Sequence, residues 1–157
     1  MDRIPITKEG FERLKKELER LKTVERKDVI EAIKEARAHG DLSENAEYDA
    51  AKERQGMIEA KIAELESKMG RFEVIDTSNF TGDRVVFGVY VEIENVDNGD
   101  RKKYRIVGPD EADISKGYIS VISPIAKALM GKGVGDTVLV RAPAGDKEYE
   151  ILNIEIK

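Results

Sequence analysis

In two long stretches of the chain, mostly apolar residues recur at alternating intervals of three and four. The first stretch runs through Phe11, Leu14, Leu18 and Leu21, and the second through Tyr48, Ala51, Gln55, Ile58, Ile62, Leu65, Met69 and Phe72. This spacing is typical of helices that bury one stripe against a partner helix. The sequence therefore predicts two long helices that fold back on each other as an antiparallel hairpin.

The first helix has capping signals at both ends. Thr7 is a suitable N-cap for a helix that opens at Lys8. Gly40 is a suitable C′ residue after a helix that ends near Ala38. The apolar stripe breaks before a fully charged segment, so we expect a kink or a phase shift within residues 23–28.

The return helix is expected to start within residues 41–45 and to run to about Phe72. Gly56 lies inside it, where glycine lowers helix stability by about 1 kcal/mol relative to alanine. We interpret this glycine as one that allows close approach of the partner helix. The hairpin is then complete within residues 1–76, and a polar linker follows at 77–83.

From residue 84 onward the apolar period becomes two, which is typical of strands. Gly88, inside the first of these strands, is interpreted as a bulge. Ser123 followed by Pro124 predicts the start of one short helix that runs through Met130. The expected strands are 84–96, 101–107, 118–122, 137–142 and 148–156, which makes residues 84–157 a compact globular domain and the whole chain a two-domain α+β protein.

Composition narrows the class of protein. Charged residues make up 38% of the chain, which suits a long hairpin with much solvated surface. The net charge of −5 comes from 27 basic and 32 acidic residues that are thoroughly mixed, so bulk adhesion to nucleic acid or to an anionic membrane is not expected. The absence of cysteine excludes disulfides, thiolate metal sites and a cysteine nucleophile. With no signal-peptide pattern and no apolar run of membrane-spanning length, we expect a cytoplasmic protein.

The stretch at the turn of the expected hairpin, residues 39–49, holds four acidic side chains and no lysine or arginine. Asp41 and Glu44 are three residues apart, so both can face one way on a helical turn. Carboxylates are the hard oxygen ligands that Mg²⁺ takes in proteins. An aspartate N-cap with a glutamate three residues later is also a capping-box-like pattern that favours the helix dipole. The pattern by itself leaves both interpretations open.

The motif GDLSENAEY, residues 40–48, resembles the tip of the GreA family of bacterial transcript-cleavage factors. The resemblance extends over essentially the whole chain. It includes IPITKEGFERL at the start, EAIKEARAHG before the tip, YRIVGPDEAD at 104–113 and ISVISPIAKALMGKGVGD at 119–136.

The resemblance implies an N-terminal antiparallel coiled coil followed by a small FKBP-like antiparallel β domain with one short helix. It implies a role as an elongation factor that rescues backtracked RNA polymerase by stimulating the polymerase's own endonucleolytic cleavage of the nascent RNA 3′ end. The globular domain would dock at the rim of the polymerase's secondary channel, and the coiled coil would reach the active site. The factor is then not an enzyme by itself.

The same resemblance assigns roles at the tip. Asp41 and Glu44 would hold a second Mg²⁺ and position its water jointly with the polymerase, and the isolated chain would bind no metal. Arg37 and Lys52 would contact the extruded RNA 3′ segment, although ordinary pairing along the helices explains them equally well. Supporting roles fall to the remaining tip residues: Gly40, Ser43, Asn45, Glu47 and Tyr48. For Tyr48, which lies on the apolar stripe, a place in the hairpin core is the favoured interpretation. His39 is interpreted as a surface residue at a helix end.

Docking to the polymerase is assigned to Ser123, Pro124 and Lys127, with their role at a helix start as the alternative. We expect a monomer. Two other functions fit the architecture: a channel-plugging inhibitor of the polymerase, and a coiled-coil adaptor whose second domain is a prolyl isomerase. The intact GDLSENAEY motif favours the cleavage factor over the inhibitor.

Overall fold

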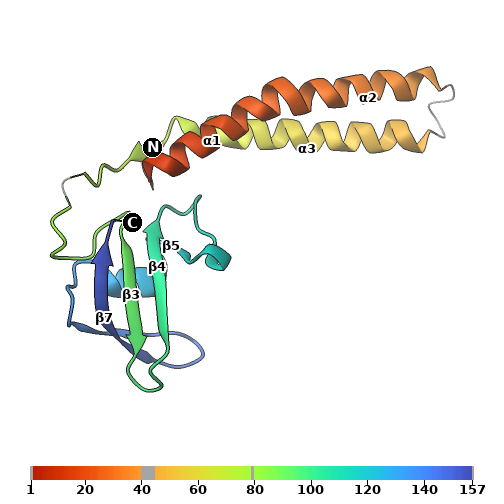
Figure 1. The fold of residues 1–157 in the computed structure, drawn as a ribbon. Coiled ribbons are helices and arrows are strands. Elements are labelled where there is room, and N and C mark those ends of the chain that lie inside the picture. The colour runs from red at the N-terminus through yellow and green to blue at the C-terminus, as the bar shows by residue number, and fades with distance from the viewer. Residues whose placement is uncertain (1, 40–44, 79, 157) are drawn as a thin grey trace. The chain divides into compact units, whose positions relative to one another are not determined.

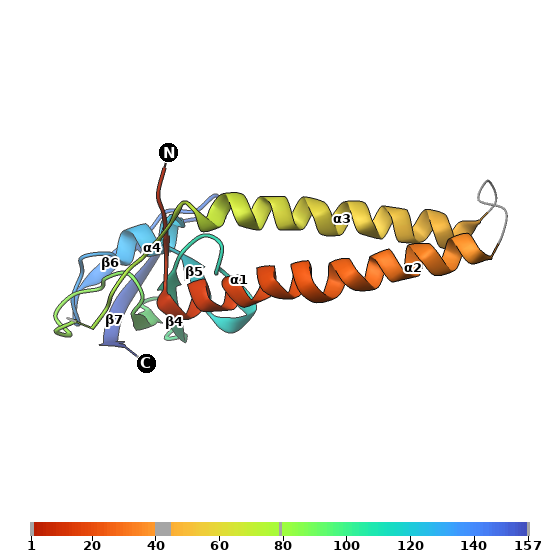
Figure 2. The same cartoon turned by 90° about the horizontal axis from the view of Figure 1, so that it is seen from above.

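The computed structural model describes residues 2–39, 45–78 and 80–156, and the chain forms two compact units (Figures 1 and 2). Phe11–Phe72 makes up the helical unit, whereas Asp2–Gly10 joins Glu73–Lys157 in the sheet unit. The predicted α+β class, with a helical hairpin and a sheet domain, is confirmed. The finer limits of 1–76, 77–83 and 84–157 for the domains and their linker stay a prediction.

The helical unit is the predicted hairpin. Its elements are α1 (Lys8–Arg20), the π-helical turn η1 (Leu21–Glu25), α2 (Arg26–Ala38) and α3 (Ala46–Met69). In Figure 1, α2 and α3 lie side by side along their length. The two apolar stripes meet in one core made of Leu21, Val29, Ile58, Ile62 and Leu65, against which Leu14 and Leu18 pack.

The predicted phase shift is the turn η1. The backbone N–H of Arg26 donates to the carbonyl of Leu21, five residues back, which is the hydrogen bond of a π turn. Such a turn contains one more residue than an α turn. The extra residue lets Leu21 and Val29, eight positions apart, face the same core.

Gly56 does not have the predicted packing role. It is exposed in α3, and a Cβ built on it would meet nothing within 4 Å. The partner helix therefore does not need a glycine here, and the close-approach prediction is wrong.

The sheet unit contains a five-stranded sheet in the order β5-β4-β3-β7-β6. The strands are β3 (Tyr90–Asn95), β4 (Arg101–Val107), β5 (Tyr118–Ser120), β6 (Thr137–Val140) and β7 (Lys147–Glu155). The short helix α4 (Pro124–Leu129) contributes Ala126 and Leu129 to the core beneath the sheet. The prediction of a wholly antiparallel sheet is wrong at one edge, because β5 pairs with β4 in parallel. The connection between them contains a short 3₁₀ helix, η3 (Ile114–Lys116), in place of a tight hairpin turn.

The predicted strand 84–96 is shorter than expected. Only Tyr90–Asn95 pairs as β3, while Val85, Phe87 and Val89 are buried without strand pairing. Gly88 has φ +92°, a conformation that ends the extended run, and a Cβ there would lie 2.7 Å from the Thr77 Cγ2 atom. Gly88 is thus not a bulge within the strand, and the irregular register with β7 lies at Glu92–Ile93 instead.

A second, two-stranded sheet pairs β1 (Ile4–Ile6) with β2 (Phe72–Val74) and was not predicted. Strands of three residues are too short to show a period in the sequence. Because Phe72 belongs to β2, the return helix ends at Met69, earlier than expected.

Candidate functional site at the tip of the helical hairpin

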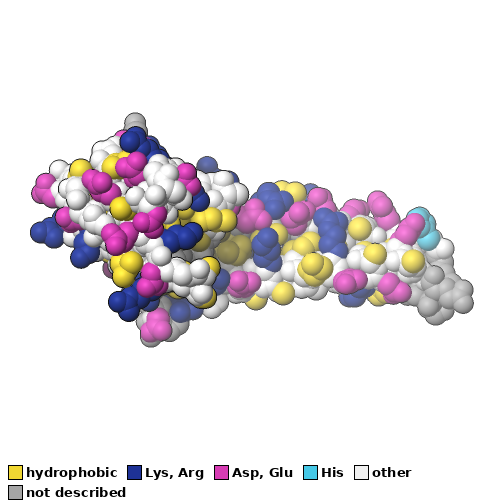
Figure 3. Space-filling model, turned by 90° about the horizontal axis from the view of Figure 1, so that it is seen from below, with side chains coloured by type: hydrophobic (Ala, Val, Ile, Leu, Met, Phe, Trp, Pro, Cys, Tyr) yellow, Lys and Arg dark blue, Asp and Glu magenta, His cyan; other side chains and the backbone are white. Residues whose placement is uncertain are grey.

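Side-chain ion pairs join the two arms of the hairpin. The Arg26 guanidinium donates two hydrogen bonds of 2.8 Å to the Glu59 carboxylate, and these bonds lower the pKa of Glu59. Lys22 and Glu66 form a second bridge at 3.0 Å. Figure 3 shows basic and acidic side chains intermingled along the hairpin rather than gathered by sign. Exposed pairs are screened by water, so they specify the alignment of the helices more than they add stability.

The hairpin is long enough to carry its tip well away from its base. With 24 residues, α3 extends over about 36 Å at 1.5 Å per residue. No helix among the described residues is both long enough and apolar enough to cross a membrane.

Four predicted tip residues lie outside the described residues: Gly40, Asp41, Ser43 and Glu44. The structure describes the chain on either side of them. Helix α2 ends at Ala38 and is followed by His39, and helix α3 begins at Ala46. The acidic segment therefore joins two well-formed helix ends.

Asn45 is the N-cap of α3. Its Oδ1 atom accepts a hydrogen bond of 3.0 Å from the Tyr48 backbone N–H, which is the expected bond for a capping asparagine. The alternative in which Asp41 and Glu44 form the capping box of the return helix is thus wrong for α3, because Asn45 has that role.

Asn45 also contacts the other arm. Its Nδ2 atom donates to the backbone carbonyl of Ala36 in the last turn of α2. Ala36 is buried and Asn45 is half-buried, so the bond is partly shielded from water. One side chain thus binds the end of α2 and the start of α3.

Two further contacts cross the hairpin near the tip. The Nδ1 atom of His39 lies 3.0 Å from the Glu47 carboxylate, with both side chains exposed. The Arg37 guanidinium lies over the Tyr48 ring, 5.9 Å from its centroid. Tyr48 is half-buried on the apolar stripe and is not one of the residues that form the hairpin core.

Arg37 and Lys52, the predicted RNA contacts, are both exposed, one on each arm. Lys52 donates to the side-chain oxygen of Gln55 at 3.2 Å, an exposed bond along its own helix. Neither side chain is buried in the hairpin, so both are placed where a phosphate could reach them. Their role with RNA stays a prediction.

The predicted metal ligands have suitable chemistry, because two carboxylates are the donors that Mg²⁺ commonly takes together with water. Within residues 2–39, 45–78 and 80–156, no group of three or more His, Asp or Glu side chains is gathered as a metal site. The assignment of Asp41 and Glu44 as metal ligands stays a prediction.

The predicted docking residues lie at the start of α4. Ser123 is its N-cap, with Oγ accepting from the Ala126 N–H at 3.3 Å, and Pro124 is the first helical residue. Lys127 is exposed on the same helix. The structural role of Ser123 and Pro124 as helix-start residues is confirmed, and their contact with a polymerase stays a prediction.

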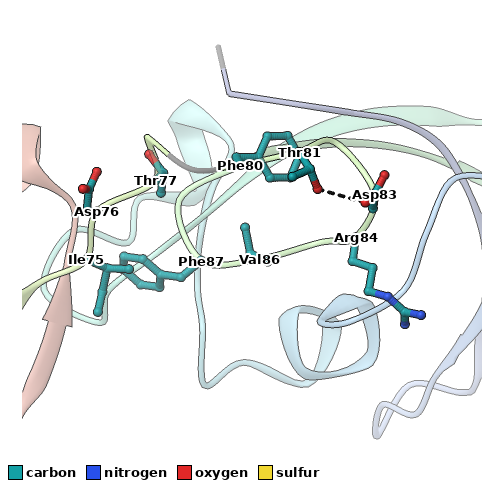
Figure 4. Close-up of a pocket in the computed structure, with 9 residues that line it drawn as sticks. All are labelled: Ile75, Asp76, Thr77, Phe80, Thr81, Asp83, Arg84, Val86 and Phe87. Atoms are coloured by element: carbon teal, nitrogen blue, oxygen red, sulfur yellow. Dashed lines mark hydrogen bonds between the residues drawn. The ribbon is translucent and has the colours of Figure 1, made fainter.

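A separate hollow of about 400 Å³ lies within the sheet unit (Figure 4). Its apolar lining includes Phe80 and Phe87, and the Thr81 hydroxyl donates to Asp83 at its rim. Arg84 donates to the carbonyl of Gly131. The described lining holds two carboxylates, Asp76 and Asp83, and no histidine.

The cross-hairpin bond of Asn45 was missed from the sequence. Asparagine is a favoured N-cap, but Asp41 and Ser43 are equally suitable by type, and the spacing does not choose among the three. A bond to a backbone carbonyl of the other helix leaves no signal in the sequence.

Comparison with known proteins covers nearly the whole chain. A family model described as transcription elongation factor, N-terminal, matches residues 4–74, and one described as transcription elongation factor, GreA/GreB, C-term, matches residues 80–156. The transcription elongation factor GreA of Solidesulfovibrio magneticus is 60% identical over 98% of this chain and 93% of its own length. That of Nitratidesulfovibrio vulgaris is 56% identical over 98% and 96%.

Among solved structures, the GreA factor homolog 1 of Thermus thermophilus is 30% identical, covers 98% of this chain and 99% of its own, and has a TM-score of 0.44.

The family predicted from the tip motif is confirmed by the two family models and by the relatives. The chain belongs to the GreA/GreB family of transcription elongation factors.

Proposed function

We propose that this chain rescues backtracked bacterial RNA polymerase by stimulating the polymerase's own cleavage of the nascent RNA 3′ end. The observation that supports this most directly is the hairpin tip: an acidic segment joins two helix ends that the Asn45 side chain binds together. Family membership supports the same function, because the matched relatives are named as transcription elongation factors.

The hairpin delivers the tip through the polymerase's secondary channel. Its apolar core and cross-arm ion pairs make it a stiff two-helix element, suited to entering a narrow passage without unfolding. The sheet unit remains at the channel rim and docks through the surface around Ser123, Pro124 and Lys127. The factor acts as a monomer in the cytoplasm.

At the active site, Asp41 and Glu44 supply carboxylate oxygens that the polymerase lacks. A second Mg²⁺ held there jointly with the polymerase would activate the attacking water for phosphodiester hydrolysis. The two side chains orient that water toward the scissile phosphate, and Arg37 and Lys52 attract the phosphates of the extruded RNA. The chain alone binds no metal and cleaves nothing, since half of the ligand set belongs to its partner.

The test is a stalled, backtracked polymerase complex with labelled RNA and Mg²⁺. Adding the protein releases short 3′ fragments. Asp41→Asn slows this release by about a hundredfold or more, because the second Mg²⁺ that would stabilise the developing charge loses one of its carboxylate ligands, while binding to the polymerase is unchanged. Asp49→Asn, an exposed change in the first turn of α3, is the matched control and leaves the rate as it is.

Normal cleavage with Asp41→Asn would exclude the metal-ligand role. Slowed RNA synthesis without fragment release would identify the chain as a channel-plugging inhibitor instead.

A further inference from the structure

We propose that Asn45 is a positioning residue for the tip carboxylates, a role separate from its function as a helix cap. The inference rests on the proposed function. Asn45 directly follows the segment 40–44, and its side chain makes one bond on each arm of the hairpin. It thereby fixes the distance between the points where that segment leaves α2 and enters α3.

The bond across the hairpin is the best shielded from water of the three contacts at this end. The His39–Glu47 pair joins side chains that are 62% and 71% exposed, so water and salt screen it. The Arg37–Tyr48 contact of 5.9 Å lies near the outer limit for a cation–π interaction. The Asn45 amide instead donates to the carbonyl of Ala36, a residue only 2% exposed.

The cap and the cross-hairpin bond use different atoms of the same amide. Oδ1 accepts from Tyr48, and Nδ2 donates to Ala36. A serine would keep the first bond and lose the second, because its one side-chain oxygen takes the place of Oδ1 and no atom stands where Nδ2 reaches the Ala36 carbonyl. Ser123 already caps α4 in this way, accepting from the Ala126 N–H. Asparagine is thus needed for joining the arms and not for starting the helix.

The bond between the arms matters because the rate of hydrolysis depends on where the two carboxylates are held. Two carboxylates at the end of a hairpin can orient one water only if the helix ends that carry them are held at a fixed separation. A misplacement of about 1 Å can cost about a hundredfold in rate. We therefore expect the loss of the Ala36 bond to slow cleavage without weakening the delivery of the hairpin.

The experiment compares Asn45→Ser, which keeps the cap, with Asn45→Ala, which loses both bonds. Cleavage of backtracked RNA is measured against factor concentration and against Mg²⁺ concentration. Asn45→Ser should lower the rate at saturating factor by about tenfold and raise the Mg²⁺ needed for half of that rate. It should leave the half-saturating factor concentration unchanged and lower the unfolding midpoint only slightly, by the cost of one hydrogen bond. Asn153→Ser, an exposed change in β7, controls for the substitution itself.

Amide hydrogen exchange of the free protein gives a readout independent of activity. Asn45→Ser should speed exchange of the His39 N–H, which also donates to the Ala36 carbonyl, and leave that of the Tyr48 N–H slow. Asn45→Ala should speed both.

Two results would overturn the inference: Asn45→Ser cleaving at the wild-type rate, or slowing only in proportion to a loss of binding or folding. If the wild-type protein releases no fragments, the proposed function fails, and the exchange data still decide whether Asn45 holds the two arms together.

Discussion

The carboxylate of Glu111 binds the backbone and the hydroxyl of Thr7, although 104 residues separate them in the sequence. Its Oε2 atom accepts from the Thr7 N–H at 3.0 Å and from the Gly108 N–H at 2.9 Å, while Oε1 accepts from the Thr7 hydroxyl. Thr7 in turn is the predicted N-cap of α1, with its Oγ1 atom accepting from the Gly10 N–H at 3.0 Å. Thr7, Gly10 and Glu111 all belong to the sheet unit, so a buried acid of that unit completes the cap at the start of α1.

Removing this acid should be costly. Glu111 is 5% exposed, and Glu111→Ala leaves the N–H groups of Thr7 and Gly108 without their acceptor. We expect a loss of about 2–4 kcal/mol in the free energy of unfolding, measured with urea. Glu111→Gln keeps one acceptor oxygen and should lose only about 1 kcal/mol. Equal losses for the two variants would contradict this, because they would assign the effect to packing rather than to hydrogen bonding.

The same site explains a glycine inside a helix. A Cβ on Gly10 would lie 2.0 Å from Oε1 of Glu111, so Gly10→Ala must displace the carboxylate. We expect it to destabilise the protein by about 2 kcal/mol. Gly56→Ala is the matched control, because its Cβ would meet nothing within 4 Å. It should stabilise by about 1 kcal/mol, the ordinary gain in a helix. The urea midpoints of the two variants should therefore move in opposite directions.

The hairpin could be predicted because its information is local. A stripe with intervals of three and four is sufficient to predict two paired helices. The broken stripe predicted a kink or a phase shift within residues 23–28, and the π turn at Leu21–Glu25 overlaps that range. The strand limits could not be predicted as well. The apolar run through Val85 and Val89 looks like one strand, but Gly88 adopts a positive φ that only the folded chain reveals.

The site shows the same division. Composition and spacing select the acidic tip as the candidate site, which stays a prediction, and the capping chemistry around it could be listed from residue types. Which residue caps α3 depends on the contact between Asn45 and Ala36, and the role of Glu111 depends on Thr7. Such contacts join residues through the fold, so no local pattern records them.

The bond between Arg26 and Glu59 makes part of the hairpin's stability depend on pH. Hydrogen bonds from Arg26 lower the pKa of Glu59 in the folded protein, so the unfolded state takes up a proton more readily. The contribution is therefore present at neutral pH and is lost as the pH falls below about 4. Glu59→Gln should lower the Tm at pH 7 and leave it equal to that of the wild type at low pH.

Glu53→Gln is the control for that experiment, because Glu53 is exposed on the same helix. It should not reproduce the difference in Tm. A Glu59→Gln effect that persists in acid would mean that the side chain stabilises the hairpin by its shape and not by its charge.

Charge reversal tests whether the basic side chains near the tip meet RNA. Arg37 and Lys52 are exposed on opposite arms, and the bonds that they make, to Tyr48 and Gln55, are also exposed. The double variant Arg37→Glu and Lys52→Glu should therefore fold normally. If both side chains contact phosphates, crosslinking to the extruded RNA 3′ end should weaken, and its slope against the logarithm of salt concentration should fall by about one per lost contact. Lys61 is exposed further along α3, and Lys61→Glu should leave both the crosslinking and its salt slope unchanged. Wild-type crosslinking by the double variant would assign Arg37 and Lys52 to the hairpin alone, since a phosphate contact cannot survive the reversal of both charges.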